Sequence, residues 1–180
     1  MAAGLRSVGL AILGFALVAA GCVTSEPAGQ TFPAATIGPA TTVSPAVNQT
    51  RAALVAALAQ FQLVLSDTQA PVRPAESPLL ANAPRAVYQV ILPKDPTRGY
   101  IVVYEFPDSP SAANAAAEEQ HYLETGPGRI QSPQGSVQVL RQVGATVVLY
   151  EWLPGAAQDA SAPQIQQALE TVGVGFPVGG

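Results

Sequence analysis

The sequence predicts an α+β domain built on a four-stranded antiparallel sheet from two αββ units, with helices packed mainly on one face. Helical and strand-like segments alternate in the order α-β-β-α-β-β-α. Turns that contain glycine separate the two strands of each unit. Residues 101–107 (IVVYEFP) and 147–154 (VVLYEWLP) have the same types of residue along most of their length. The two segments either arose by duplication or converged because strands in similar positions require similar residues.

The first 21 residues have the pattern of a secretory signal peptide. Arg6 is the one charged residue among residues 1–7, and residues 8–20 are apolar without interruption. A membrane-spanning helix needs about 20 apolar residues, so this shorter run fits the hydrophobic region of a signal peptide better than a stable span.

Cys22 is the only cysteine in the chain, and it follows the small residues Ala19, Ala20 and Gly21. A single cysteine cannot form an internal disulfide. The stretch LVAAGC at residues 17–22 resembles the lipobox of bacterial lipoproteins, although Ala19 stands where leucine is more common. The resemblance implies that a diacylglyceryl group is added to the Cys22 thiol and that the signal is cleaved between Gly21 and Cys22. The new amino group is then open to acylation, for example with palmitate.

This resemblance predicts an extracytoplasmic protein that is anchored to the bacterial cell membrane by lipid on Cys22. One acyl chain anchors a protein only marginally, whereas two or three hold it stably. The alternative is an uncleaved apolar anchor in which Cys22 is an incidental buried thiol. Residues 22–46 are rich in Thr, Ser, Pro, Gly and Ala, and Glu26 is their one charged residue. We therefore expect a flexible tether with a span of about 25–30 Å, followed by a single α+β domain over residues 47–180.

The first helix is predicted to begin at Ser44-Pro45, because serine is a good N-cap and proline suits the first helical position. Leu54, Leu58 and Phe61 continue as one apolar stripe to about residue 65. The following loop, residues 66–85, contains four prolines. We expect it to lie across the fold and to bury Leu79 and Leu80.

The remaining elements are two hairpins and two helices. The strands are expected at residues 86–92, 100–106, 136–142 and 145–153, and the helices at 111–123 and 163–172. Both strands that contain Tyr-Glu are apolar on both faces, so we expect them in the centre of the sheet. Residues 136–142 are apolar on one face only, which predicts an edge strand.

Aromatic residues of the two central strands form the candidate binding face. Tyr104 and Phe106 share one side of the first strand, and Tyr150 and Trp152 share one side of the second. With helices on one face of the sheet, these aromatics are either covered by the loop 66–85 and the C-terminal residues or exposed to bind a partner or ligand.

Few other residues have a pattern typical of catalysis or of metal binding. Glu105 and Glu151 would lie side by side if the central strands paired in that register; otherwise each lies at a strand end, half solvated, near Arg98 or Arg141. His121 is the only histidine, with Glu118 and Glu124 three residues away on either side, and a zinc site needs more ligands than these. We therefore predict no metal, no cofactor and no enzymatic activity.

The charge of the chain argues against nucleic acid as a partner. The formal net charge is −4, Lys94 is the only lysine, and the arginines are scattered. The segments VVYEFPDSPSAANAAA and VVLYE resemble parts of small α/β domains in uncharacterised bacterial lipoproteins. We expect a lipid-anchored cell-envelope lipoprotein with a non-catalytic binding or scaffolding domain, whose partners are the membrane and an envelope protein or ligand. The alternative is a small-molecule or lipid carrier that uses the aromatic sheet face.

Overall fold

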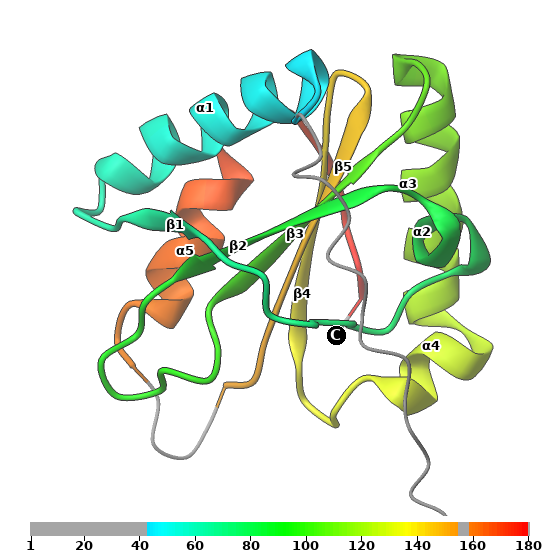
Figure 1. Ribbon diagram of the computed structural model, residues 1–180. Coiled ribbons are helices and arrows are strands. Elements are labelled where there is room, and N and C mark those ends of the chain that lie inside the picture. The colour runs from blue at the N-terminus through cyan, green and yellow to red at the C-terminus, as the bar shows by residue number, and fades with distance from the viewer. Residues whose placement is uncertain (1–42, 155–158, 180) are drawn as a thin grey trace, which may run out of the picture. The chain divides into compact units, whose positions relative to one another are not determined.

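The computed structural model describes residues 43–154 and 159–179 (Figure 1). Their strands form a six-stranded antiparallel sheet in the order β1-β2-β3-β5-β4-β6. The strands are β1 (Leu65–Asp67), β2 (Arg85–Val90), β3 (Tyr100–Glu105), β4 (Val137–Val143), β5 (Thr146–Trp152) and β6 (Val174–Phe176). The helices are α1 (Pro45–Ala59), α2 (Pro78–Asn82), α3 (Ser109–Glu124), α4 (Gly126–Gln131) and α5 (Ala162–Glu170).

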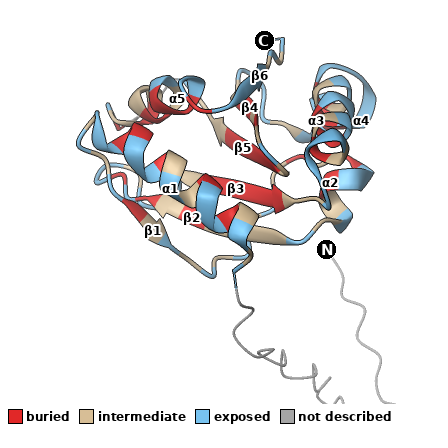
Figure 2. Ribbon diagram, turned by 90° about the horizontal axis from the view of Figure 1, so that it is seen from above, coloured by how far each residue is buried: buried red, intermediate tan, exposed pale blue. Residues whose placement is uncertain are grey.

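The α+β class agrees with the prediction, but the four-stranded sheet with helices on one face is wrong. Two strands of three residues each, β1 and β6, extend the sheet at its edges. Helices α1 and α5 pack on one face, and α2 and α3 lie on the other (Figures 1 and 2). The physical reason is that β3 and β5 are apolar on both faces, so both faces need a cover that excludes water.

The central position of the two Tyr-Glu strands is confirmed. Strand β3 pairs with β5, with Tyr104 opposite Val147 and Ile101 opposite Tyr150. The edge position predicted for residues 136–142 is wrong, because β6 pairs with the outer side of β4. Leu140 lies opposite Phe176 in this pairing.

The core is divided into two layers by the sheet. Figure 2 shows the buried strands between the inward sides of the helices. The layer between the sheet and α1 and α5 includes Leu54, Leu58, Ile101, Val148, Tyr150, Ile165 and Leu169. The layer beneath α2 and α3 includes Leu80, Val102, Tyr104, Ala112, Ala115, Ala116, Val147 and Leu149. Alanines form much of the buried side of α3.

The predicted start of α1 is confirmed, and its predicted end is wrong. The Ser44 side chain accepts a hydrogen bond from the backbone N–H of Val47 at 3.1 Å. The helix ends at Ala59, because the chain reverses at Gln62, which has a φ of 60°. Leu65 therefore belongs to β1 and not to the helix. Leu80 is fully buried as expected, but Leu79 is 44% exposed.

Candidate functional site

The two tyrosines of the predicted aromatic face lie on opposite faces of the sheet. Tyr104 packs in the layer beneath α3, and Tyr150 packs in the layer beneath α1 and α5. Both side chains are fully buried. The two tyrosines therefore do not share one face. Of the two alternatives, exposure is wrong for both of them, and cover by the loop 66–85 agrees with the contact between Tyr104 and Glu76. Antiparallel pairing with Val147 opposite Tyr104 puts the two Tyr-Glu motifs out of phase, so matching residues point to opposite faces.

The other two aromatic residues of that predicted face are also separated. Phe106 is half-buried against the α3 layer. Trp152 is half-buried against the opposite layer, and its Nε1 donates to Oε1 of Gln166 at 3.0 Å.

The predicted acidic and histidine candidates do not converge. Glu105 lies opposite Thr146, at one end of the β3–β5 pair, while Glu151 lies beyond Tyr150 at the other end. His121 is exposed on α3. Within the described ranges 43–154 and 159–179, no three acidic, histidine or cysteine side chains are grouped so that they could hold a metal ion. The lipidation residue Cys22 and the cleavage position Gly21 lie outside the described residues.

The arginines suggested as partners of these carboxylates have other contacts. Arg98 pairs with Asp95, with 3.1 Å between Nε and Oδ2. Arg141 donates to the carbonyl oxygens of Val172 and Gly173. Glu151 instead accepts a hydrogen bond from Nε2 of Gln138 at 3.1 Å.

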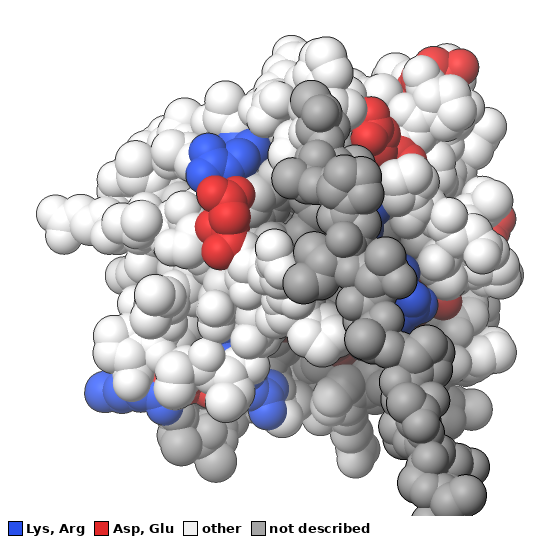
Figure 3. Space-filling model, in the orientation of Figure 1, with Lys and Arg blue, Asp and Glu red and all other residues white. Residues whose placement is uncertain are grey.

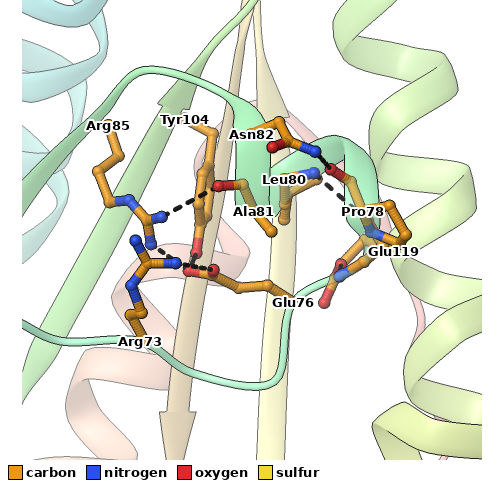
Figure 4. A network of polar contacts seen from close by, with 10 residues as sticks. Arg73, Glu76, Pro78, Leu80, Ala81, Asn82, Arg85, Tyr104 and Glu119 are labelled. Atoms are coloured by element: carbon orange, nitrogen blue, oxygen red, sulfur yellow. Dashed lines mark hydrogen bonds and ion pairs between the residues drawn. The ribbon is translucent and has the colours of Figure 1, made fainter.

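A buried polar cluster joins the proline-rich segment 68–84, which we call the strap, to the sheet (Figure 4). The Tyr104 hydroxyl donates to Oε1 of Glu76 at 2.6 Å. The Arg85 guanidinium forms an ion pair with the same oxygen. Arg73 lies 3.9 Å from the other oxygen of Glu76. The Glu76 side chain is only 5% exposed, so the cluster holds the strap in place and leaves little room for a substrate.

Glu119 of α3 forms a second polar attachment of the strap. Its Oε2 accepts the backbone N–H of Ser77 at 2.6 Å. Its Oε1 is buried and has no hydrogen-bond partner among the described residues. Burial raises the pKa of this carboxyl to about 7; the Ser77 hydrogen bonds oppose the shift, and the nearby Glu76 and Glu118 carboxylates add to it.

Sequence reasoning missed Glu119, although a signal was present. Ala112, Ala115, Ala116 and Leu123 form the apolar stripe of α3, and Glu119 falls within it at helical spacing. No sequence pattern marks Glu76 and Arg85 in the same way. Their ion pair depends on the path that the strap takes across the sheet.

A cavity of about 120 Å³ lies at the end of the sheet where β3 begins and β5 ends; we call it the strand-end pocket. Val72 and Pro74 of the strap form one wall, and Val102 and Leu149 of the sheet line it from below. Its polar and aromatic lining residues include Arg98, Tyr100, Ser136, Glu151 and Trp152.

The turn between β2 and β3 positions Arg98 beside this pocket. Gly99 has a φ of +83°, and a Cβ at this position would lie 2.2 Å from the Val90 carbonyl oxygen. A side chain here would therefore force the turn to move. The Gly99 carbonyl in turn accepts the N–H of Val90 at 2.9 Å, which fixes the return of the chain into β3.

The pocket combines opposite charges with an apolar floor. Among the described residues, Arg98 and Glu151 form no ion pair with each other within 4.0 Å, although both line the pocket. Each has one polar atom engaged by a neighbour, Asp95 for Arg98 and Gln138 for Glu151. On the face drawn in Figure 3, Lys, Arg, Asp and Glu side chains lie in several separate small groups and not in one large charged patch. This pocket is therefore the candidate site.

Comparisons with known protein families, with curated proteins and with solved structures found no match to this chain. In the part of the chain that the structure describes, every helix is too short or too polar to cross a bilayer.

Proposed function

We propose that this protein is a lipid-anchored, extracytoplasmic protein of the bacterial cell envelope whose domain binds a partner or ligand without catalysis. The observation that carries the proposal is the order of features at the N-terminus. A single charge at Arg6, an uninterrupted apolar run and small residues lead directly to Cys22.

The length and composition of the sequence between Cys22 and the domain support a tethered arrangement. Helix α1 begins at Pro45, and the residues between it and Cys22 are mainly Thr, Ser, Pro, Gly and Ala. Such a composition cannot bury enough apolar surface to offset the entropy of ordering. A tether of this kind lets a compact domain reach a ligand or neighbour near the membrane surface.

The chemistry of the domain favours binding over catalysis. An acid–base mechanism needs its groups within reach of one substrate atom. Glu105 and Glu151 lie at opposite ends of the central strand pair, and His121 is exposed on α3. The buried carboxylate of Glu76 is held by Tyr104 and Arg85 and is almost closed to solvent.

The anchor is tested by metabolic labelling of the full chain in a bacterial host with radioactive palmitate. Wild-type protein should carry the label and remain with the membranes, and Cys22→Ser should lose both properties. Ser25→Ala, three residues after Cys22, is the matched control and should behave like wild type. Equal labelling and membrane retention of Cys22→Ser would refute the proposal.

A further inference from the structure

We propose that the strand-end pocket binds a free apolar α-amino acid of about the size of leucine. This proposal rests on the binding function proposed above, because it names a ligand for that function. It does not depend on the lipid anchor. It is carried by three features of the pocket that occur together: an apolar floor, a limited volume and two opposite charges beside it.

The floor selects an apolar group. Val72, Pro74, Val102 and Leu149 come from the strap and the two central strands and present only aliphatic surface. Val102 and Leu149 are already only 1% and 2% exposed, so the accessible part of this surface belongs to the half-buried Val72 and Pro74. Burying a ligand group against these two residues removes apolar area from water on both sides, which is favourable at about 25 cal/mol per Å². Tyr100 adds an aromatic wall, and Trp152 lines the pocket from the end of β5 while its indole packs against the other face of the sheet.

The volume limits the size of that group. The cavity measures about 120 Å³. A cavity of about 150 Å³ lined by aliphatic side chains holds one benzene molecule. The strand-end pocket therefore fits a branched aliphatic side chain of a few carbons.

The charges select the polar part of the ligand. Arg98 is an exposed residue whose Nε is engaged by Asp95, and its two Nη groups have no partner among the described residues. Glu151 uses Oε1 to accept from Gln138, and its Oε2 has no partner among them. A guanidinium that can receive a carboxylate and a carboxylate that can receive an ammonium, both lining one small pocket, match the two ends of a zwitterion.

A ligand does not have to break an ion pair between Arg98 and Glu151, because none joins them within 4.0 Å among the described residues; exposed ion pairs add little stability in any case. Arg98 and Glu151 are instead each held by a short-range neighbour in their own hairpin. The ligand would bridge them, with its side chain on the floor formed by Val102 and Leu149.

The experiment uses Trp152, the single tryptophan of the chain, which lines the pocket. The purified full chain, held in phosphatidylcholine vesicles where it carries lipid, is titrated with L-leucine up to about 10 mM while tryptophan fluorescence is followed. Equilibrium dialysis with radioactive leucine gives the stoichiometry. We expect saturable binding of one leucine per chain.

Three related probes test each part of the assignment. N-acetyl-L-leucine lacks the ammonium group, L-leucinamide lacks the carboxylate, and glycine lacks the apolar side chain. Each should bind about tenfold or more weakly than leucine. Equal affinity for N-acetyl-L-leucine or L-leucinamide would overturn the zwitterion, and equal affinity for glycine would overturn the role of the floor.

Substitutions test the same groups from the side of the protein. Arg98→Gln and Glu151→Gln should each weaken leucine binding by about tenfold or more, because each leaves one ligand charge unpaired. Arg129→Gln and Glu118→Gln, both exposed and outside the pocket, are the matched controls and should leave it unchanged. Absence of leucine binding in wild-type protein that is correctly labelled at Cys22 would overturn this inference and leave the proposed anchoring intact.

Discussion

The buried carboxyl of Glu119 should make the stability of the domain depend on pH, and Glu119→Gln should remove that dependence. Burial raises its pKa from the ordinary value of 4.5 to about 7. Between these two values the unfolded chain is ionised at this residue, while the folded chain keeps the proton. The unfolded state therefore binds fewer protons, and the free energy of unfolding falls as the pH rises through this range.

The size of the effect follows from the pKa difference. One pKa unit corresponds to about 1.4 kcal/mol. The change in the pKa of Glu119 from 4.5 to about 7 therefore corresponds to about 3 kcal/mol in the free energy of unfolding. Nearly all of this stability is present below pH 4.5, and it is lost by the time the pH has passed 7. Glu76 from the strap and Glu118 on α3 are the nearby carboxylates, and both oppose ionisation of Glu119.

Glutamine is the appropriate replacement because it has the same shape and stays neutral. Its side-chain oxygen can still accept the N–H of Ser77, which Oε2 of Glu119 accepts at 2.6 Å. Urea unfolding followed by Trp152 fluorescence gives the free energy of unfolding at several values between about pH 5 and pH 8. We expect Glu119→Gln to be more stable than wild type at the upper end by up to about 3 kcal/mol.

The control is Glu118→Gln, which changes an exposed carboxylate next to Glu119 in the sequence. It should leave most of the pH dependence in place. If Glu119→Gln and wild type lose stability in parallel between about pH 5 and pH 8, the buried carboxyl is not the source of the dependence and the reasoning fails.

Two further predictions concern buried polar contacts elsewhere in the domain. The Thr146 hydroxyl donates to the Val143 carbonyl at 2.9 Å, so the 2.7 Å contact between the two threonine hydroxyls must use the proton of Thr50. Thr146→Val should therefore lower the free energy of unfolding by about 1–3 kcal/mol, and Thr50→Val by less, as measured by urea unfolding; the reverse order would contradict this donor assignment. Asp159 accepts the backbone N–H groups of both Lys94 and Ser161 at 2.9 Å. Asp159→Ala should speed hydrogen exchange at the Lys94 amide, and unchanged protection there would show that the contact does not hold the turn.

The elements that the sequence predicted well are those with a local cause. Ser44 caps α1, and Asp108 caps α3 by accepting the N–H of Ser111 at 2.7 Å. The two Tyr-Glu strands are central because they are apolar on both faces. The same pattern also predicts a cover on each face of the sheet, which the prediction of helices on one face does not take into account.

The elements that could not be predicted depend on distant partners. Strands β1 and β6 have three residues each, which is too short for an alternating pattern to be read. Strand β1 exists because Leu65 meets Val90, and β6 exists because Phe176 meets Leu140. Similarly, the strand-end pocket combines residues from the strap, a hairpin turn and two strands, and none of these segments carries a motif alone.

The strap connects the buried polar cluster with the pocket. Val72 and Pro74 form a pocket wall, and Glu76 and Ser77, which follow directly in the chain, are the residues held by Tyr104 and Glu119. These two polar attachments therefore help to hold the wall in position, together with the buried Leu80 of the same segment. Arg98 lies in the turn before β3 and Glu151 in β5, and their printed side-chain contacts are to Asp95 and Gln138, so their substitution changes the charges that line the pocket without removing a contact of the strap. This separation is what allows loss of ligand binding to be distinguished from loss of the pocket itself.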